Sequence, residues 1–515
     1  MERKGVHLLK DYYPYFWLKP FCMSAKTRSP KFIESLIPII ALIALLAFNV
    51  YVFKDDATGG PNQIALLFAA VIAAVIGIRQ GFSWKDLQEG MVNSIKSSLG
   101  AVLILLIIGA LSGTWMISGV VPTMIYYGLD ILDPSYFLVA SCVICAIVAL
   151  ATGSSWSTIA TVGIALLGIG SVMGISEGMI AGAIISGAYF GDKMSPLSDT
   201  TNLAPAMAGT DLFTHIRYMM YTTVPTLFIT LIIFLFLGLS LDAKTDVAGI
   251  ESMQQVLGET FTISPWLFLV PGVVIGLIIM KWDALPALFF GTLAGGVAAI
   301  IAQPNIVNQL SGITDDYFMS SYKTFFSTIA SSSNIETSNV SINELLSTGG
   351  MSGMLNTIWL VICSMCFGGV MEVTGMLKRI TSSFINSKES AGSLIAKTAG
   401  TCIFFNATTS DQYLAIVVPG RMFSKEFNDR GLKPENLSRT LEDSGTVTSP
   451  LIPWNTCGAY HAGVLGVATG TYWMFCFFNL ISPLMTVFYG FLNIRIRRYS
   501  KEEMEAIKKE QSKKA

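Results

Sequence analysis

The stretch GDKMSPLSDTT, residues 191–201, places three charges, a proline and several hydroxyls between two strongly apolar segments. The stretch GTVTSPLIPWNT at 445–456 repeats its Gly, Ser, Pro and Leu at the same spacing, 254 residues later. The same offset pairs ATGSSWST at 151–158 with FNATTSDQ at 405–412. Two matches at one offset indicate an internal repeat, in which every copy interrupts an apolar run with small and polar residues.

The chain has the composition of a multi-pass membrane protein. Of its 515 residues, 52% are hydrophobic and 13% are charged, whereas a soluble domain carries about 25% charged residues. Apolar runs long enough to cross a lipid bilayer recur along the whole chain. The predicted spans are 35–53, 63–79, 99–119, 135–175, 177–212, 214–239, 266–280, 284–302, 350–373, 392–420, 440–467 and 470–493. A net charge of −1 without a basic stripe gives no indication of a nucleic-acid partner.

Charge in the connecting segments predicts their side of the membrane. Lys and Arg concentrate in 79–97, 374–391 and 421–439, whereas 120–134, 240–263 and 303–349 are mainly acidic. The positive-inside rule therefore predicts that the first three are cytoplasmic and the second three external. Both basic termini are predicted to be cytoplasmic.

This sidedness divides the chain into two halves of the same plan, inserted in opposite directions. We predict an all-α fold of two inverted repeats, each with about five transmembrane helices plus a hairpin, and discontinuous helices at their interface. The predicted parts are an N-terminal segment 1–34, a first repeat 35–239, an external linker 240–263, a second repeat 264–493 with the external loop 303–349, and a basic tail 494–515.

The polar interruptions have the chemistry of a cation site. Helices in a bilayer break only where protein or water satisfies the freed backbone groups. Carbonyls, hydroxyls and carboxylates at such breaks are hard oxygen ligands for a small cation. Burial favours the protonated form of a carboxylate, and a bound cation favours the ionised form. One carboxylate that holds either Na⁺ or H⁺ would therefore suffice for ion exchange.

The candidate ligands lie at the four predicted breaks. They are Asp192, Asp199, Asp411, Thr152, Ser154, Ser155, Ser195, Thr200, Asn202, Asn406, Thr408, Thr409, Asn455 and Thr456, and a Na⁺ site is predicted at Asp199, Thr200, Asp411 and Thr408. Glu372, Trp156, Trp454 and His461 are further candidates.

Structural roles remain open for the same residues. A hydroxyl in a membrane helix often donates only to the carbonyl one turn back. Asp192 and Lys193 are also consistent with an ion pair at the membrane surface, and Glu372 with a side chain that reaches the nearby cytoplasmic loop.

Other classes of protein find little support in the sequence. There is no G-x-x-x-x-G-K-[ST] phosphate-binding loop, so a secondary carrier is favoured over an ATP-driven pump, and neither an enzyme nor a cofactor is indicated. The pairs Cys142/Cys145 and Cys363/Cys366 have C-x-x-C spacing, but small residues packing a membrane helix are the preferred interpretation. A channel fits the paired breaks less well than alternating access does.

The long motifs resemble a known family. GAYFGDKMSPLSDTTNLAPAMAGTDLFTHIRYM at 187–219, EDSGTVTSPLIPWNTCGAYHAGVLGVAT at 442–469 and FNATTSDQYLAIVVPGRMF at 405–423 resemble the NhaC family of bacterial Na⁺/H⁺ antiporters, in the ion transporter superfamily. The resemblance covers most of 35–495 and implies exchange of Na⁺ or Li⁺ for H⁺ across the bacterial inner membrane. By analogy, it also implies a homodimer.

The resemblance leaves two functions open. Some relatives look like malate/Na⁺-lactate antiporters, and others carry amino acids. A Na⁺(Li⁺)/H⁺ antiporter is the first hypothesis. The alternative is a Na⁺- or H⁺-coupled carrier of a small organic acid or amino acid.

Overall fold

The protein is a bundle of helices in the computed structural model, which describes residues 27–53, 57, 59–241, 247–337, 343, 346–382, 390–500 and 502–504. Within these ranges, eight helices are long and apolar enough to cross a membrane, or up to ten if two bent pairs each count as one span. In the described ranges, β-structure is limited to two isolated bridges. The predicted all-α multi-pass fold is therefore confirmed, while most of 1–34 and about half of 494–515 lie outside the described residues.

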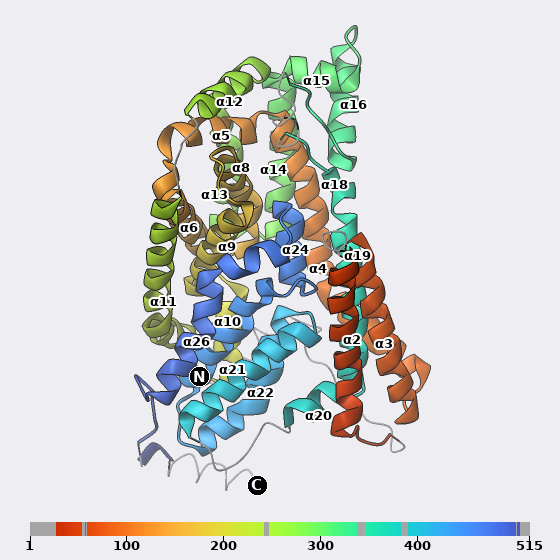
Figure 1. The fold of residues 1–515 in the computed structure, drawn as a ribbon, viewed down its shortest axis with the longest axis vertical. Coiled ribbons are helices and arrows are strands. Elements are labelled where there is room, and N and C mark those ends of the chain that lie inside the picture. The colour runs from red at the N-terminus through yellow and green to blue at the C-terminus, as the bar shows by residue number, and fades with distance from the viewer. Residues whose placement is uncertain are drawn as a thin grey trace.

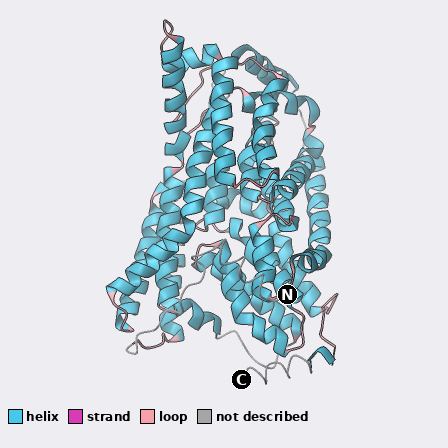
Figure 2. Ribbon diagram, turned by 180° about the vertical axis from the view of Figure 1, so that it is seen from behind, coloured by secondary structure: helices cyan, strands magenta, loops and turns pink. Residues whose placement is uncertain are grey.

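The helices follow the predicted order (Figures 1 and 2). The first half contains α2 (Phe32–Phe53), α3 (Pro61–Arg79), α4 (Trp84–Ile117), α5 (Val120–Ile131), α6 (Pro134–Thr152), α7 (Ser155–Thr158), η2 (Ile159–Gly163), α8 (Ile164–Val172), α9 (Glu177–Met194), α10 (Asp199–Ala208) and α11 (Leu212–Ser240). The second half contains α12 (Val247–Thr260), η3 (Pro265–Phe268), α13 (Leu269–Ile279), α14 (Ala284–Ala302), α15 (Pro304–Ser311), α16 (Tyr317–Ala330), α18 (Gly350–Gly353), α19 (Leu355–Val373), α20 (Met376–Ser382), α21 (Ala391–Thr408), α22 (Gln412–Asp429), α23 (Pro434–Leu441), η4 (Glu442–Thr446), η5 (Ser449–Leu451), α24 (Thr456–Leu465), α25 (Thr469–Tyr472), η6 (Trp473–Phe475) and α26 (Phe477–Phe491).

The segments between spans are more helical than predicted. The predicted external segments contain α5, α12, α15 and α16, which lie together at one end of the molecule, and α20 lies at the other end (Figure 1). The predicted loop 79–97 is wrong for most of its length, because α4 begins at Trp84. Ser83 and Asp86 form a capping box there, which satisfies the free N–H groups of the first turn.

All four predicted interruptions of apolar segments are present. The first is Gly153–Ser154 between α6 and α7, and the second is 195–198 between α9 and α10. The third is 409–411 between α21 and α22, and the fourth is 452–455 between η5 and α24. Two wider π-helical turns, η2 and η4, adjoin these interruptions, a location typical of functional segments.

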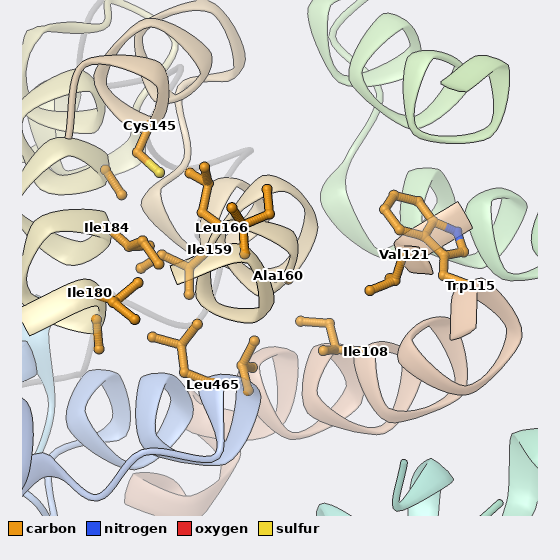
Figure 3. Close-up of a cluster of buried hydrophobic side chains, with 14 of the residues drawn as sticks. Ile108, Trp115, Val121, Cys145, Ile159, Ala160, Leu166, Ile180, Ile184 and Leu465 are labelled. Atoms are coloured by element: carbon orange, nitrogen blue, oxygen red, sulfur yellow. The ribbon is translucent and has the colours of Figure 1, made fainter. Parts of the chain in front are cut away.

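Small residues bring α6 and α9 into close contact. A Cβ atom on Gly187 would lie 2.0 Å from the Cys142 carbonyl oxygen, and one on Gly191 would lie 2.2 Å from that of Ala146. Cys145 is buried in the hydrophobic core beside Ile184 and other side chains of α8 and α9 (Figure 3). This packing fixes the two elements that carry the first pair of interruptions.

Candidate functional site

A cavity of about 1250 Å³ lies where the interrupted helices meet. Its lining includes the start of α7, the start of α10, the start of α22 and residues of α4 and α19. The structure thus brings together segments from both halves of the chain, as the repeat predicted.

Ten predicted site residues line this cavity, and they come from seven helices or their caps. They are Thr152, Ser154, Ser155, Trp156, Asp192, Asp199, Thr200, Glu372, Asp411 and Thr456. Among them, the Asp199 side chain is exposed while Asp192 and Asp411 are 7% and 4% exposed. Asp199 is therefore the most accessible of these three carboxylates.

The first hairpin, α6–α7, and the interrupted helix α9–α10 form what we call the first unit. Gly153 ends α6 with a φ of 72°, a left-handed conformation that favours glycine. An added Cβ at Gly153 would lie 2.6 Å from the Cβ of Leu197, so the hairpin tip rests directly on the second interruption.

Asp192 joins the two parts of the first unit. One carboxylate oxygen, Oδ2, accepts hydrogen bonds from the Ser155 backbone N–H at 3.1 Å and from the Ser155 hydroxyl at 2.6 Å. This places a negative charge at the N-terminal end of α7, where it satisfies a free N–H group. The membrane-surface ion pair of Asp192 with Lys193 is wrong, because both side chains are buried and neither bonds to the other.

The second hairpin, α21–α22, and the interrupted helix α23–α24 (434–465) form the second unit, which is joined by neutral groups. The Asn406 amide donates to the Gly445 carbonyl at 2.6 Å and to Thr448 Oγ1 at 3.0 Å. The Asn455 amide donates back to the Asn406 carbonyl at 3.0 Å. The Trp454 indole donates to the Ala407 carbonyl at 2.7 Å.

Asp411 begins α22 as its N-cap and accepts from the Leu414 backbone N–H at 2.9 Å. The preceding residue, Ser410, has a φ of 60°, and its carbonyl accepts from the Thr456 backbone N–H at 2.9 Å. The tip of the second hairpin is therefore attached to the start of α24, and the carboxylate of Asp411 borders the cavity.

The other predicted ligands have structural contacts and do not line the cavity. Thr408 and Thr409 each donate to the carbonyl one turn back, both at 2.8 Å. The Asn202 amide donates to the carbonyls of the second interruption, and Ser195 Oγ accepts from the Leu197 N–H. Ser195, Asn202, Asn406, Thr408, Thr409, Trp454 and Asn455 therefore hold the interrupted segments together without lining the cavity, and Thr408 is not beside Asp199 in its wall.

His461 lies in an aromatic contact between the two units. Its Nε2 is 2.9 Å from the Tyr189 hydroxyl. Its neighbour Tyr460 stacks on Trp156 with ring centroids 3.9 Å apart and donates to the Trp156 carbonyl. Helix α24 therefore packs on the tip of the first hairpin, and His461 is part of this contact rather than of the cavity wall.

The prediction from sequence missed a group of buried charges behind the cavity. Lys193 forms an ion pair with Asp443, and Thr200 Oγ1 donates to Glu442 at 3.0 Å. All four of these side chains are at most 5% exposed. In the sequence, the acidic pair Glu442–Asp443 at the start of an apolar run indicated that buried charges were present here.

A cavity bordered by interrupted helices in a multi-pass bundle defines a membrane transporter. A model of the Na⁺/H⁺ antiporter family matches residues 187–494. The chain is 38% identical over 455 residues to the Na⁺/H⁺ antiporter NhaC of Alkalihalophilus pseudofirmus, covering 88% of this chain and 94% of the relative. The chain belongs to the Na⁺/H⁺ antiporter family.

Two other relatives are named for different substrates. The chain is 37% identical to the malate-2H⁺/Na⁺-lactate antiporter of Bacillus subtilis, covering 90% of this chain and 95% of the relative. It is 35% identical to the arginine/ornithine antiporter ArcD of Halobacterium salinarum, covering 92% and 95%.

Proposed function

We propose that the protein exchanges cytoplasmic Na⁺ for external H⁺ by alternating access at this cavity. The observation that carries the proposal is the convergence of the carboxylates Asp199, Asp411 and Glu372 on one cavity from three different elements. Carboxylates and hydroxyls are the ligands that hard cations prefer. Na⁺ favours the ionised form of carboxyls near it and H⁺ the neutral form, so binding of one ion opposes binding of the other.

Asp199 and Thr200 from the first unit and Asp411 from the second unit form the proposed cation site. Asp199 is open to the cavity, and Thr200 and Asp411 border it from opposite units. A cation held between the two units is able to change their relative position, which is what alternating access requires.

The cavity opens toward the cytoplasm in this proposal. Its lining includes Lys96, Lys378 and Arg421, all from segments whose charge predicts a cytoplasmic location. Inverted insertion of the two halves accounts for both this location and the pairing of the interruptions.

The cavity size supports the alternative of an organic substrate. A volume of about 1250 Å³ exceeds what a single Na⁺ needs, and Trp156, Trp282 and Tyr413 offer aromatic surface. Within this alternative, the carboxylates of the wall attract a cationic group and its Lys and Arg side chains attract an anionic group, so an amino acid fits the lining better than a dicarboxylate does.

Purified protein in liposomes with an internal pH indicator tests both functions. We expect Na⁺ alone to drive proton movement, and proton movement only with malate, lactate, arginine or ornithine would favour the alternative. Asp199→Asn and Asp411→Asn should each weaken apparent Na⁺ affinity at least about tenfold, since a bond to a charged ligand is worth about 1.5–3 kcal/mol.

Asp316→Asn is the matched control for Asp411→Asn. Asp316 caps α16 through the Met319 N–H at 3.0 Å, as Asp411 caps α22, but it does not line the cavity. Wild-type Na⁺ affinity in both cavity variants would contradict the proposed site.

A further inference from the structure

The buried charges behind the cavity wall are not explained by the proposed cation site. Lys193, Asp443, Glu442 and Arg439 are each 0% exposed, and none of them lines the cavity. The Lys193 ammonium donates to the Asp443 carboxylate and to the Ser482 hydroxyl. Asp443 in turn accepts from Thr222 Oγ1 at 2.9 Å.

Glu442 is the carboxylate of this group that has no ion pair among the described residues. Thr200 Oγ1 donates to its Oε1 at 3.0 Å, and the Thr446 hydroxyl of its own segment also lies close to its carboxylate. Thr200 also borders the cavity, next to Asp199. A single side chain therefore separates Glu442 from the proposed cation site.

The surroundings give Glu442 no dedicated cation. On its own segment, the Arg439 guanidinium lies over the Tyr218 ring at 4.6 Å, and Lys193 is committed to Asp443. The charged or titratable side chains on the elements packed around this group are Glu177, Tyr189, Asp192 and Lys193 from α9, Asp199 from α10, His215, Arg217, Tyr218 and Tyr221 from α11, Lys397 and Cys402 from α21, Asp411, Tyr413, Arg421, Lys425, Glu426 and Asp429 from α22 or its cap, Glu435 and Arg439 from α23, and Tyr489 from α26. A buried carboxyl whose nearest cation, Lys193, is already paired with Asp443 holds a proton more readily than a carboxyl in water does.

We propose, on the basis of the Na⁺/H⁺ exchange above, that Glu442 is the carboxyl that carries the proton and that Thr200 links it to the cation at Asp199. Na⁺ enters beside Thr200 while the proton leaves Glu442, so the charge of the region is unchanged. The Thr200 hydroxyl then donates to an ionised Glu442 and turns its lone pairs toward the cation. Proton and cation thus occupy different carboxylates that are coupled through one hydroxyl.

Glu442→Gln tests this assignment, because it preserves shape and removes the titrating group. In wild-type protein, binding of radioactive Na⁺ should weaken as the pH falls between about pH 9 and 6, since protons displace Na⁺. In Glu442→Gln, we expect binding that no longer varies with pH, retained Na⁺/Na⁺ exchange in liposomes, and loss of Na⁺-driven proton movement. A variant that still moves protons with Na⁺ as the wild type does would overturn the proposal.

Glu435→Gln is the matched control, since Glu435 lies two turns earlier in the same segment and pairs with Arg497. It should retain the wild-type pH dependence of Na⁺ binding. If wild-type protein moves no protons with Na⁺, the proposed Na⁺/H⁺ exchange itself is wrong, and this is known before any variant is compared.

Asp443→Asn provides a second test that does not depend on the folding of Glu442→Gln. It frees the Lys193 ammonium to stabilise an ionised Glu442, so protons should compete less well with Na⁺. We expect the pH of half-maximal Na⁺ binding to fall by about one pH unit or more. An unchanged or higher midpoint would overturn the proposal, because loss of a merely structural contact has no reason to move the midpoint in that direction.

Discussion

The two units share a plan but differ in how each hairpin is attached to its interrupted helix. In the first unit, a carboxylate, Asp192, holds the hairpin through Ser155. In the second, the amides of Asn406 and Asn455 hold the corresponding tip. The first attachment depends on charge, and the second does not. A cation or proton near the first unit therefore changes its attachment directly, while the second unit can serve as a fixed reference.

The largest effect on stability is expected at the buried ion pair between Lys193 of the first unit and Asp443 of the second. Lys193→Met leaves Asp443 buried without its cation, which should destabilise the fold by about 3–5 kcal/mol. The midpoint of unfolding in detergent measures the loss. The double variant Lys193→Met/Asp443→Leu should recover most of it, because no unpaired charge remains.

Lys433→Met is the control, since the Lys433–Glu503 pair is partly exposed, at 31% and 46%. It should cost less than about 1 kcal/mol. If Lys193→Met and Lys433→Met lowered the free energy of unfolding equally, burial of the Lys193–Asp443 pair would not add to its contribution to stability.

A smaller difference in stability is expected between substitutions at the two hairpin tips. Ser155→Ala removes a hydrogen bond to a carboxylate and should cost about 1.5–3 kcal/mol, whereas Thr409→Val removes one to a neutral carbonyl and should cost about 0.5–1.5 kcal/mol. Thr409 lies at the repeat offset from Ser155. Unfolding midpoints that rank the other way would contradict the charge-based attachment of the first unit.

The smallest effect concerns the backbone at the two tips. Ser410 has a φ of 60°, a conformation that costs an L-residue about 1–2 kcal/mol, so Ser410→Gly should stabilise the protein by about 1 kcal/mol. Gly153→Ala should do the reverse, because its φ is 72° and its new Cβ would meet Leu197. Opposite shifts of the unfolding midpoint are expected, and shifts of the same sign would refute this reading of the two turns.

Local signals in the sequence predicted much of the fold. Apolar runs gave the spans, and the offset from Gly191 to Gly445 located all four interruptions. The helices within the acidic segments were not predicted, because a long apolar run identifies only membrane-spanning helices. Helices α15 and α16 are too polar or too short to have such a run.

The site was predicted only in part, because contacts between distant elements leave no local pattern. Asp199 and Asp411 were identified from their polar neighbours, and both line the cavity. Glu442 was overlooked since an acid at the start of an apolar run has the same appearance whether it faces water or Thr200. Its neighbour Asp443 finds its partner 250 residues away in Lys193, which only the packed structure reveals.

The path of the cavity along α4 has an electrical consequence. The α4 residues in its wall extend from Gly90 to Ile104, a distance of about 21 Å at 1.5 Å per residue. The predicted span begins at residue 99, so the part of this wall that lies within the span, 99–104, is about 8 Å long. In the proposed orientation, water in the cavity would carry the cytoplasmic potential that far into the membrane. A charge that crosses the remaining layer would experience the larger part of a voltage worth about 2.3 kcal/mol per 100 mV.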